Sequence, residues 1–355
     1  MAARYAYLAA KAYDYETGLL DTDNSASAGT RFLSDIVKAR SLGVLRDGEP
    51  QVFGGEGDPG LADILARMKA DWDVVKTRFG YNNPDIETSR FSLRTELFRI
   101  SPSASGDVAW QQVLEDHVVE DLNQLDIYRR YCRPFTDSTN AQPAIVIPFS
   151  TCIEFGYNFF GQPLCGGDNA YDPSHSATRI RSVGIWFTGY NTTFNTNDTG
   201  GGLANEPRVY LIPVGVDIKR SPTDTAELRY WDVFDQALPL PYNIGESDLD
   251  DPTWIPVFDS LTENFGKLRR YASLRAYHDR GQFVEEETHN NARLIGRSVW
   301  NTQWYLIIPG GTLLSDPWEG IQRFIYGARN PDGTRNGNGI RDIKIFFQTY
   351  SIWGE

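Results

Sequence analysis

The chain has 355 residues, of which 41% are hydrophobic and 23% charged, and its formal net charge at pH 7 is −13. This length predicts about two domains with enough apolar surface for a large core, which excludes intrinsic disorder as the main state. Residues 1–150 hold 16 Lys and Arg against 22 Asp and Glu, and residues 151–355 hold 18 against 25. Neither half therefore offers the basic face that binding to nucleic acid or to an anionic membrane requires.

Targeting signals are also missing from the sequence. No apolar run reaches the roughly 18 residues that a membrane-spanning helix needs, and charged residues interrupt the first 20 positions, so we predict no secretory signal peptide. The cellular location stays open, and export as part of a larger protein is one expectation. The three cysteines are odd in number and lack CxxC spacing, which predicts neither a disulfide framework nor a zinc site and leaves their redox state open. They are Cys132, Cys152 and Cys165.

Residues 1–84 have the periodicity of helices. Apolar and small residues recur at steps of three and four from Met1 to Leu20, and Thr30 can cap a second helix that runs to about Leu42. A third helix is expected to begin after Asp58 and Pro59 and to end near residue 80. We expect three aromatic side chains of this segment to pack between the helices or against the next domain. They are Tyr5, Tyr13 and Trp72.

From residue 85 onward, short extended runs bounded by Gly, Pro, Asn and Asp dominate. A helical pattern returns only at 109–131. We therefore predict an α+β protein: a helical segment over 1–84, then an antiparallel β-sandwich of jelly-roll type over 85–355 with one helix near 109–131. Pro213 indicates an edge strand or a bulge. The expected strands are 91–97, 144–149, 152–155, 179–188, 208–218, 304–308 and 342–352.

The segment 330–342 has the composition of a calcium loop, because oxygen-bearing side chains alternate there with glycines. Its candidate metal ligands are Asp332, Asn336, Asn338 and Asp342. Two arginines, Arg335 and Arg341, lie within the same stretch and favour the alternative of a Gly-rich hairpin loop without an ion. The acidic stretches 21–24 and 246–251 are further candidates for calcium.

Signals for catalysis are sparse. The chain has no GxSxG, HExxH or GxxxxGK[ST] motif, and its four histidines are scattered. A pair of carboxylates in a glycosidase would not be visible in the sequence, so the enzyme question stays open and a non-enzymatic role is favoured. Trp254 and Trp318 follow Asp/Pro loops, and we expect them to be exposed and to contact a sugar or a protein.

Four segments, in their order along the chain, resemble a known family. They are Ser89–Arg94 (SRFSLR), Thr178–Ile185 (TRIRSVGI), the Trp- and Pro-containing run Trp300–Pro309, and the terminal strand Asp342–Tyr350. Their order is similar to the C-terminal part of the A component of bacterial Tc-type insecticidal toxin complexes. That resemblance implies a non-enzymatic β-sandwich at the end of a very large, oligomeric, pore-forming chain, where it docks the cocoon-forming partner.

The sequence departs from that family in two ways. A short helical stretch replaces the long channel helices, and long inserts occupy 190–205 and 222–259. Pore formation is therefore not implied for this chain. We predict an interaction or assembly module, the C-terminal part of a large bacterial toxin-like or secreted multi-domain protein, that binds a protein partner or a second copy of itself. The alternatives are a lectin-type carbohydrate-binding module with a calcium ion and, second, a polysaccharide hydrolase.

Overall fold

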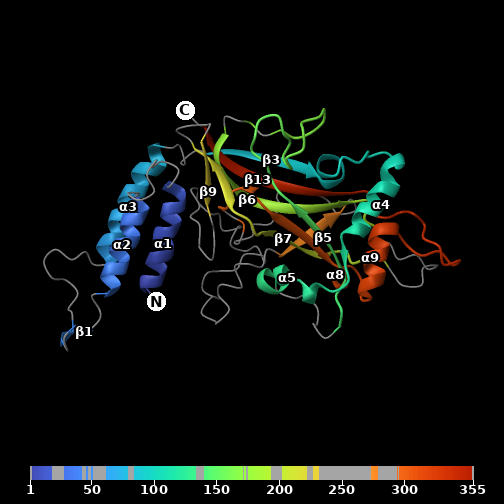
Figure 1. Cartoon of the computed structure of the whole chain (residues 1–355), viewed down its shortest axis with the longest axis horizontal. Coiled ribbons are helices and arrows are strands. Elements are labelled where there is room, and N and C mark those ends of the chain that lie inside the picture. The colour runs from blue at the N-terminus through green and yellow to red at the C-terminus, as the bar shows by residue number, and fades with distance from the viewer. Residues whose placement is uncertain are drawn as a thin grey trace.

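The computed structural model describes residues 2–17, 28–41, 45–46, 49–50, 61–78, 84–132, 140–170, 172, 175–192, 202–221, 227–231, 273–278, 294 and 296–353. A stem of three helices stands at one end of the molecule, and a β-rich body with further helices forms the rest (Figure 1). The body contains an eight-stranded mixed sheet and a three-stranded sheet. The α+β class predicted from the sequence is therefore confirmed.

The stem consists of α1 (Ala2–Thr17), α2 (Ala28–Ser41) and α3 (Leu61–Arg78), which confirms the three predicted helices. Alanines on α1 let the helices approach closely, because their side chains are small. The buried hydrophobic cluster between these helices consists of Ala6, Ala10, Ile36 and Ile64. Between α2 and α3, β1 (Leu45–Arg46) pairs with β2 (Glu49–Pro50).

Aromatic residues connect the stem helices to one another and to the body, as the sequence predicts. The buried ring of Tyr13 meets Phe32 edge-on at 5.3 Å between ring centroids and Trp72 at 6.3 Å. Trp72 in turn packs against Ala177 and Ile352, which belong to two strands of the body. The side chain of Tyr5 lies outside the described residues.

The strand order of the large sheet is β3-β13-β6-β10-β7-β12-β5-β4. All its pairs are antiparallel except β10 with β6, which run parallel, so the expectation of a purely antiparallel sheet was wrong at this pair. The strand bounds are β3 Asp85–Ser92, β4 Val118–Val119, β5 Ala144–Phe149, β6 His175–Thr188, β7 Arg208–Pro213, β10 Ser273–His278, β12 Trp304–Pro309 and β13 Asp342–Trp353.

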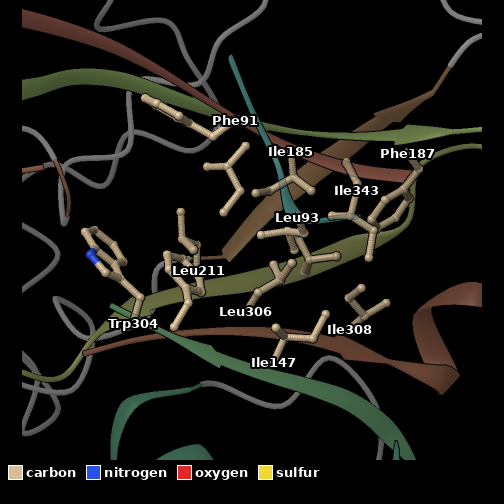
Figure 2. Close-up of a cluster of buried hydrophobic side chains, with 14 of the residues drawn as sticks. Phe91, Leu93, Ile147, Ile185, Phe187, Leu211, Trp304, Leu306, Ile308 and Ile343 are labelled. Carbon is tan, nitrogen blue, oxygen red and sulfur yellow. The ribbon is translucent and has the colours of Figure 1, made fainter. Parts of the chain in front are cut away.

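Strand β10 joins two halves of this sheet. Its first three residues pair with β7, and its last three pair with β6. Apolar side chains from β3, β6 and β13 face those from β5, β7 and β12 (Figure 2). Trp304 of β12 and Phe347 of β13 meet with ring centroids 5.8 Å apart. The main core of the protein thus lies between the two halves, and burial of this apolar surface is the main force that holds them together.

The helix predicted for 109–131 is interrupted. The structure has α4 (Asp107–Asp116), then β4, a 3₁₀ turn (Leu122–Gln124) and the short α5 (Asp126–Tyr131). Val118 and Val119 leave the helical path because they pair with Ile145 and Ala144 of β5. The side chain of Asp121 accepts a hydrogen bond from the amide of Asn123, which starts the next turn. Tertiary pairing has overridden the helical periodicity here.

Other expected strand boundaries also differ. The strand expected through Leu97 ends at Ser92, whose hydroxyl caps a π-helix over Leu93–Leu97. Residues 152–155 form part of a loop rather than a strand. Pro213 is the last residue of β7, which lies between β10 and β12 and is therefore neither an edge strand nor bulged at that residue. Two helices were not expected, namely α8 (Gly310–Leu313) and α9 (Pro317–Tyr326).

The small sheet has the order β11-β8-β9, and it meets the end of α1. Its strands are β8 (Asp217–Arg220), β9 (Leu228–Trp231) and β11 (Trp300–Asn301). The ring of Tyr15, near the end of α1, packs edge-on against Trp231 at 5.8 Å between centroids. The stem is therefore attached to the body by side-chain packing on this sheet as well as through Trp72.

Ionisable side chains are buried at this junction. Glu16 and Arg179 form an ion pair of 2.6 Å, and neither side chain is accessible to solvent. Asp217 accepts hydrogen bonds from Arg297 at 2.8 Å and from the hydroxyl of Tyr15 at 3.1 Å. We call Glu16, Arg179, Asp217, Lys219 and Arg297 the buried charge cluster.

Lys219 is a buried member of the cluster. Its Nζ donates to the carbonyl oxygen of Tyr15 at 2.6 Å and lies 3.0 Å from the centroid of the Tyr15 ring. Burial, followed by the nearby charge of Arg179, lowers the pKa of Lys219 well below its usual range. Burial also raises the pKa of Tyr15. Loss of the lysine proton would leave two arginines opposite two carboxylates, which is a balanced set of buried charges.

None of the helices that the structure describes combines the length and the apolar character needed to cross a membrane.

The buried ion pair can be tested by mutation. Arg179→Met is expected to lower the free energy of unfolding by about 3–5 kcal/mol, because it leaves the carboxylate of Glu16 buried without its cation. The double variant Glu16→Gln/Arg179→Met should lose less, since it removes both charges. Urea denaturation measures the free energy of unfolding of the wild type, the single variant and the double variant. Arg129→Met, which removes an exposed pair with Asp126, is the control and should cost under about 1 kcal/mol. A double variant less stable than Arg179→Met would contradict this coupling.

Candidate functional site

Three large apolar side chains are exposed together on one loop of the body. Phe155 has 91% of its surface exposed, Tyr157 43% and Leu164 46%. All three belong to residues 152–169, which we call the aromatic loop. Tyr157 forms an isolated antiparallel bridge with Pro163, and the amide of Leu164 donates to the carbonyl of Gly156 at 3.0 Å. Residues 156–164 therefore form a small hairpin. Tyr157 and Leu164 lie on it, and Phe155 immediately precedes it.

The middle of the aromatic loop is anchored in the core. The rings of Phe159 and Phe91 stack with centroids 3.6 Å apart, and Phe160 meets Phe149 edge-on at 5.5 Å. Phe159 and Phe160 are both buried. Consecutive residues thus hold the chain on the body while the exposed residues project from it.

Polar contacts fix the loop further. Both carboxylate oxygens of Asp168 accept hydrogen bonds from Arg99, at 2.7 and 2.8 Å. The buried carboxylate of Glu96 accepts two hydrogen bonds from Asn169, and the side chain of Asn158 donates to the carbonyl of Glu96 at 2.9 Å. Within the loop, the amide oxygen of Asn158 accepts from the backbone amides of Phe160 and Gln162. This network fixes the backbone conformation of the loop in the absence of a partner.

The residues that fix the loop come from an irregular segment. Glu96 lies in the π-helix Leu93–Leu97, and Arg99 follows it with a positive φ of 57°. A π-helix and a left-handed residue other than glycine are both uncommon, and both recur at functional sites. Here they aim Glu96 and Arg99 at the loop.

A polar cavity of about 450 Å³ lies elsewhere on the body. Its walls are formed by Asp107, Trp110 and Gln111 of α4 and by residues 189–191 and 337–341. Its volume is within the range of small-molecule sites. Trp110 and Tyr190, which are only 1% and 4% exposed, form part of its wall, and the side chains of Gln111, Asn338 and Arg341 supply hydrogen-bonding groups.

The proposed calcium ligands are placed differently from one another. The side-chain oxygen of Asn336 accepts from the amide of Asn338, and Asp332 accepts from the amide and hydroxyl of Thr334. Those bonds to Thr334 lower the pKa of Asp332. Asp342 is used at the start of β13, where it accepts from the hydroxyl of Ser92 and the amide of Arg94. Calcium binding by the four residues stays a prediction.

An arginine of the same segment, Arg335, forms an ion pair with α9. Arg335 reaches back to α9 and forms a bidentate contact with Glu319, at 2.8 and 2.9 Å. Arg323 also donates to Glu319 at 2.9 Å. These arginines lower the pKa of Glu319 to about 2. The ion pair of Arg335 with Glu319 thus connects the segment to α9.

Of the two tryptophans predicted to be exposed, the structure describes only Trp318. Trp318 is exposed on the first turn of α9, where it follows the N-cap Asp316. It is not among the residues that line the polar cavity, and its role in binding stays a prediction. Trp254 and the acidic stretches 21–24 and 246–251 lie outside the described residues.

Sequence reasoning missed the aromatic loop and one further cluster. Phe155, Tyr157 and Leu164 were not singled out, although Gly156 and Gly161 mark the turns around them, and both have a positive φ. The described residues also bring together Asp85, Glu87 and His175, whose ligand atoms lie within 4.8 Å of one another. No sequence signal could have found that cluster, because 88 positions separate Glu87 from His175 in the chain.

Comparison with known proteins adds no functional information. No model of a protein family matches the chain, and no curated protein matches it significantly. Function must therefore be argued from the residues themselves.

The ion pairs of Glu319 predict a dependence on pH. Because the pKa of Glu319 is lowered in the folded state, its contribution to stability is present at neutral pH and is lost as the pH falls from about 4.5 through about 2. Glu319→Gln should therefore be less stable at pH 7, and its deficit should shrink across this acid range. Thermal unfolding at a series of pH values measures the difference.

Glu120→Gln is the control, since the exposed Glu120 makes no ion pair within the described part of the chain. A deficit of Glu319→Gln that stays constant between neutral and acid pH would contradict this role.

Proposed function

We propose that the chain is a non-enzymatic interaction and assembly module that binds a protein partner through the aromatic loop. The observation that carries this proposal is the exposure of Phe155, Tyr157 and Leu164 on one loop whose backbone is fixed. Large aromatic side chains are common anchors of protein interfaces. A loop that is already ordered loses little conformational entropy when it binds, so more of the contact energy contributes to affinity.

The size of the patch favours insertion into a pocket of another protein. Three side chains cover much less than the roughly 800 Å² per partner of a standard interface. A small protruding patch suits the role of an anchor that enters an apolar pocket, surrounded by weaker contacts. The polar cavity of this chain does not match such an apolar tip, so we propose a different protein as the partner.

This proposal extends to the setting of the chain. We propose that it is the C-terminal part of a larger toxin-like protein of bacterial origin, and that its body is a sandwich of jelly-roll type. The order of the four family-like segments supports the first point. The facing apolar side chains of the two sheet halves support the second (Figure 2).

Mutation of the three exposed side chains of the aromatic loop tests the proposal. The variant Phe155→Ser/Tyr157→Ser/Leu164→Ser is expected to weaken partner binding about thirtyfold or more, the effect of losing a hot spot of about 2 kcal/mol. Wild type and variant are immobilised in equal amounts, exposed to an extract of the source cells, and compared for retained proteins by mass spectrometry. In a blot of the same extract, the native chain should migrate well above the size of 355 residues.

A matched control distinguishes the effect of the loop from that of removing any exposed apolar side chain. Val108→Ser changes an exposed valine on α4 and should retain the partner as wild type does. Equal retention of every protein by the triple variant would refute docking through the loop. Sedimentation of the purified chain tests whether the partner is a second copy of the same chain. If the wild type self-associates and the triple variant does not, the loop binds another copy rather than a different protein.

A second candidate function is saccharide binding in the polar cavity. Its side-chain amides and guanidinium group supply the hydrogen-bond donors and acceptors that sugar hydroxyls and carboxylates need. Arg341 makes no ion pair within the described residues, so its charge is free to meet an acidic sugar.

Saturation-transfer NMR with neutral and acidic monosaccharides tests this candidate. Arg341→Ala and Gln111→Ala are expected to weaken the signal at least tenfold for an acidic sugar, because each removes hydrogen bonds to it. Trp318→Ala, outside the cavity, is the control. Loss of binding in Trp318→Ala alone would move the sugar site to α9.

A further inference from the structure

A cluster of three potential metal ligands lies on the face of the large sheet near the stem. Asp85 and Glu87 are two positions apart on the edge strand β3, so their side chains leave the same face of the sheet. His175 is the first residue of β6, on the other side of the intervening strand β13. Asp85 pairs with Ser351 of β13, and His175 pairs with Trp353 of the same strand. The sheet therefore brings the three residues together across one strand.

The imidazole lies between the two carboxylates. Its Nε2 is 3.2 Å from Asp85 Oδ2, and its Nδ1 is 3.8 Å from Glu87 Oε2. A neutral imidazole carries one N–H, so it can donate to only one of these carboxylates while its other nitrogen presents a lone pair. A carboxylate facing a lone pair is repelled unless a cation lies between them.

No basic side chain supplies that cation. Within the described residues, neither Asp85 nor Glu87 forms an ion pair with a lysine or an arginine. His175 is only 1% exposed, so the field of the two carboxylates is poorly screened at the ring. The cluster thus has a negative charge that a bound cation would balance.

The donor set selects the kind of cation. One imidazole nitrogen and two carboxylate oxygens suit zinc and similar transition metals, whereas calcium and magnesium prefer oxygen ligands alone. Tetrahedral ligands about 2.0–2.1 Å from zinc are separated by about 3.4 Å. The Nε2 of His175 is 3.2 Å from Asp85 Oδ2, close to that value. One ligand atom from each of the three residues lies within 4.8 Å of the other two, so Glu87 has to move closer to complete the set.

The cluster also leaves room for further ligands. The side chains of Asp85 and Glu87 are 38% and 48% exposed, so they can rotate to close around an ion that keeps contact with water. We propose that Asp85, Glu87 and His175 bind one divalent transition-metal ion, with zinc as the best match. The ion would link the edge strand β3 to β6 across β13.

Zinc itself is the probe for the experiment. The full chain, without an affinity tag and in a Cys165→Ser background that removes an exposed thiol, is treated with a chelator and titrated with Zn²⁺ by calorimetry. We expect one equivalent to bind. Asp85→Asn and Glu87→Gln should each weaken binding at least tenfold, because each removes an anionic ligand, and calcium should not compete.

Two controls make the result decisive. Asp332→Asn, in the segment predicted to bind calcium, should bind zinc as the parent does. Hydrogen exchange should show that zinc slows exchange of the β3 amides in the parent but not in Glu87→Gln. Because Glu87 is half exposed, this variant is expected to fold even if a change at His175 does not. Absence of zinc binding, or unchanged binding in both carboxylate variants, would overturn the proposal, and the histidine would then be balanced by a proton alone.

Discussion

The rest of the structure depends on the buried charge cluster at the end of α1. Charged groups lose their hydration when they are buried, so this arrangement is stable only if every partner is in place. Its members are Glu16 of α1, Arg179 of β6, Asp217 and Lys219 of β8, and Arg297. A mis-docked stem would leave at least one of these charges unpaired. The cluster therefore specifies a single orientation of the stem more strongly than it stabilises the fold.

The apolar core supplies most of the burial that stabilises the body. Facing side chains of the two sheet halves supply non-directional burial, and β10 connects the halves by pairing with a strand of each. The same core holds Phe159 and Phe160, whose neighbours form the exposed tip of the aromatic loop. The side chains that could bind a partner thus lie next to residues buried in the core, which suits a preformed site.

Local patterns in the sequence predicted much of the fold but little of the site. The stem helices were visible because caps and periodicity agree, as at Asp58 and Pro59, and strands such as β5 were visible as apolar runs bounded by turns. The break after α4 was not, because Val118 and Val119 leave the helix only to pair with a distant strand. The charge cluster, the aromatic loop and the Asp85–Glu87–His175 cluster depend on contacts between residues far apart in the chain. A single sequence contains no record of such contacts.

The position of β13 has a consequence for how the protein is made. This strand lies between β3 and β6, so residues 85–92 have their hydrogen-bonding partner in residues 344–351. While the ribosome is still translating the intervening region, β3 and one edge of β6 have no neighbour. Unpaired strand edges can associate with other chains. The nascent protein therefore carries exposed β-edges until residues 342–353 emerge, which makes translation of that strand the step that closes the body.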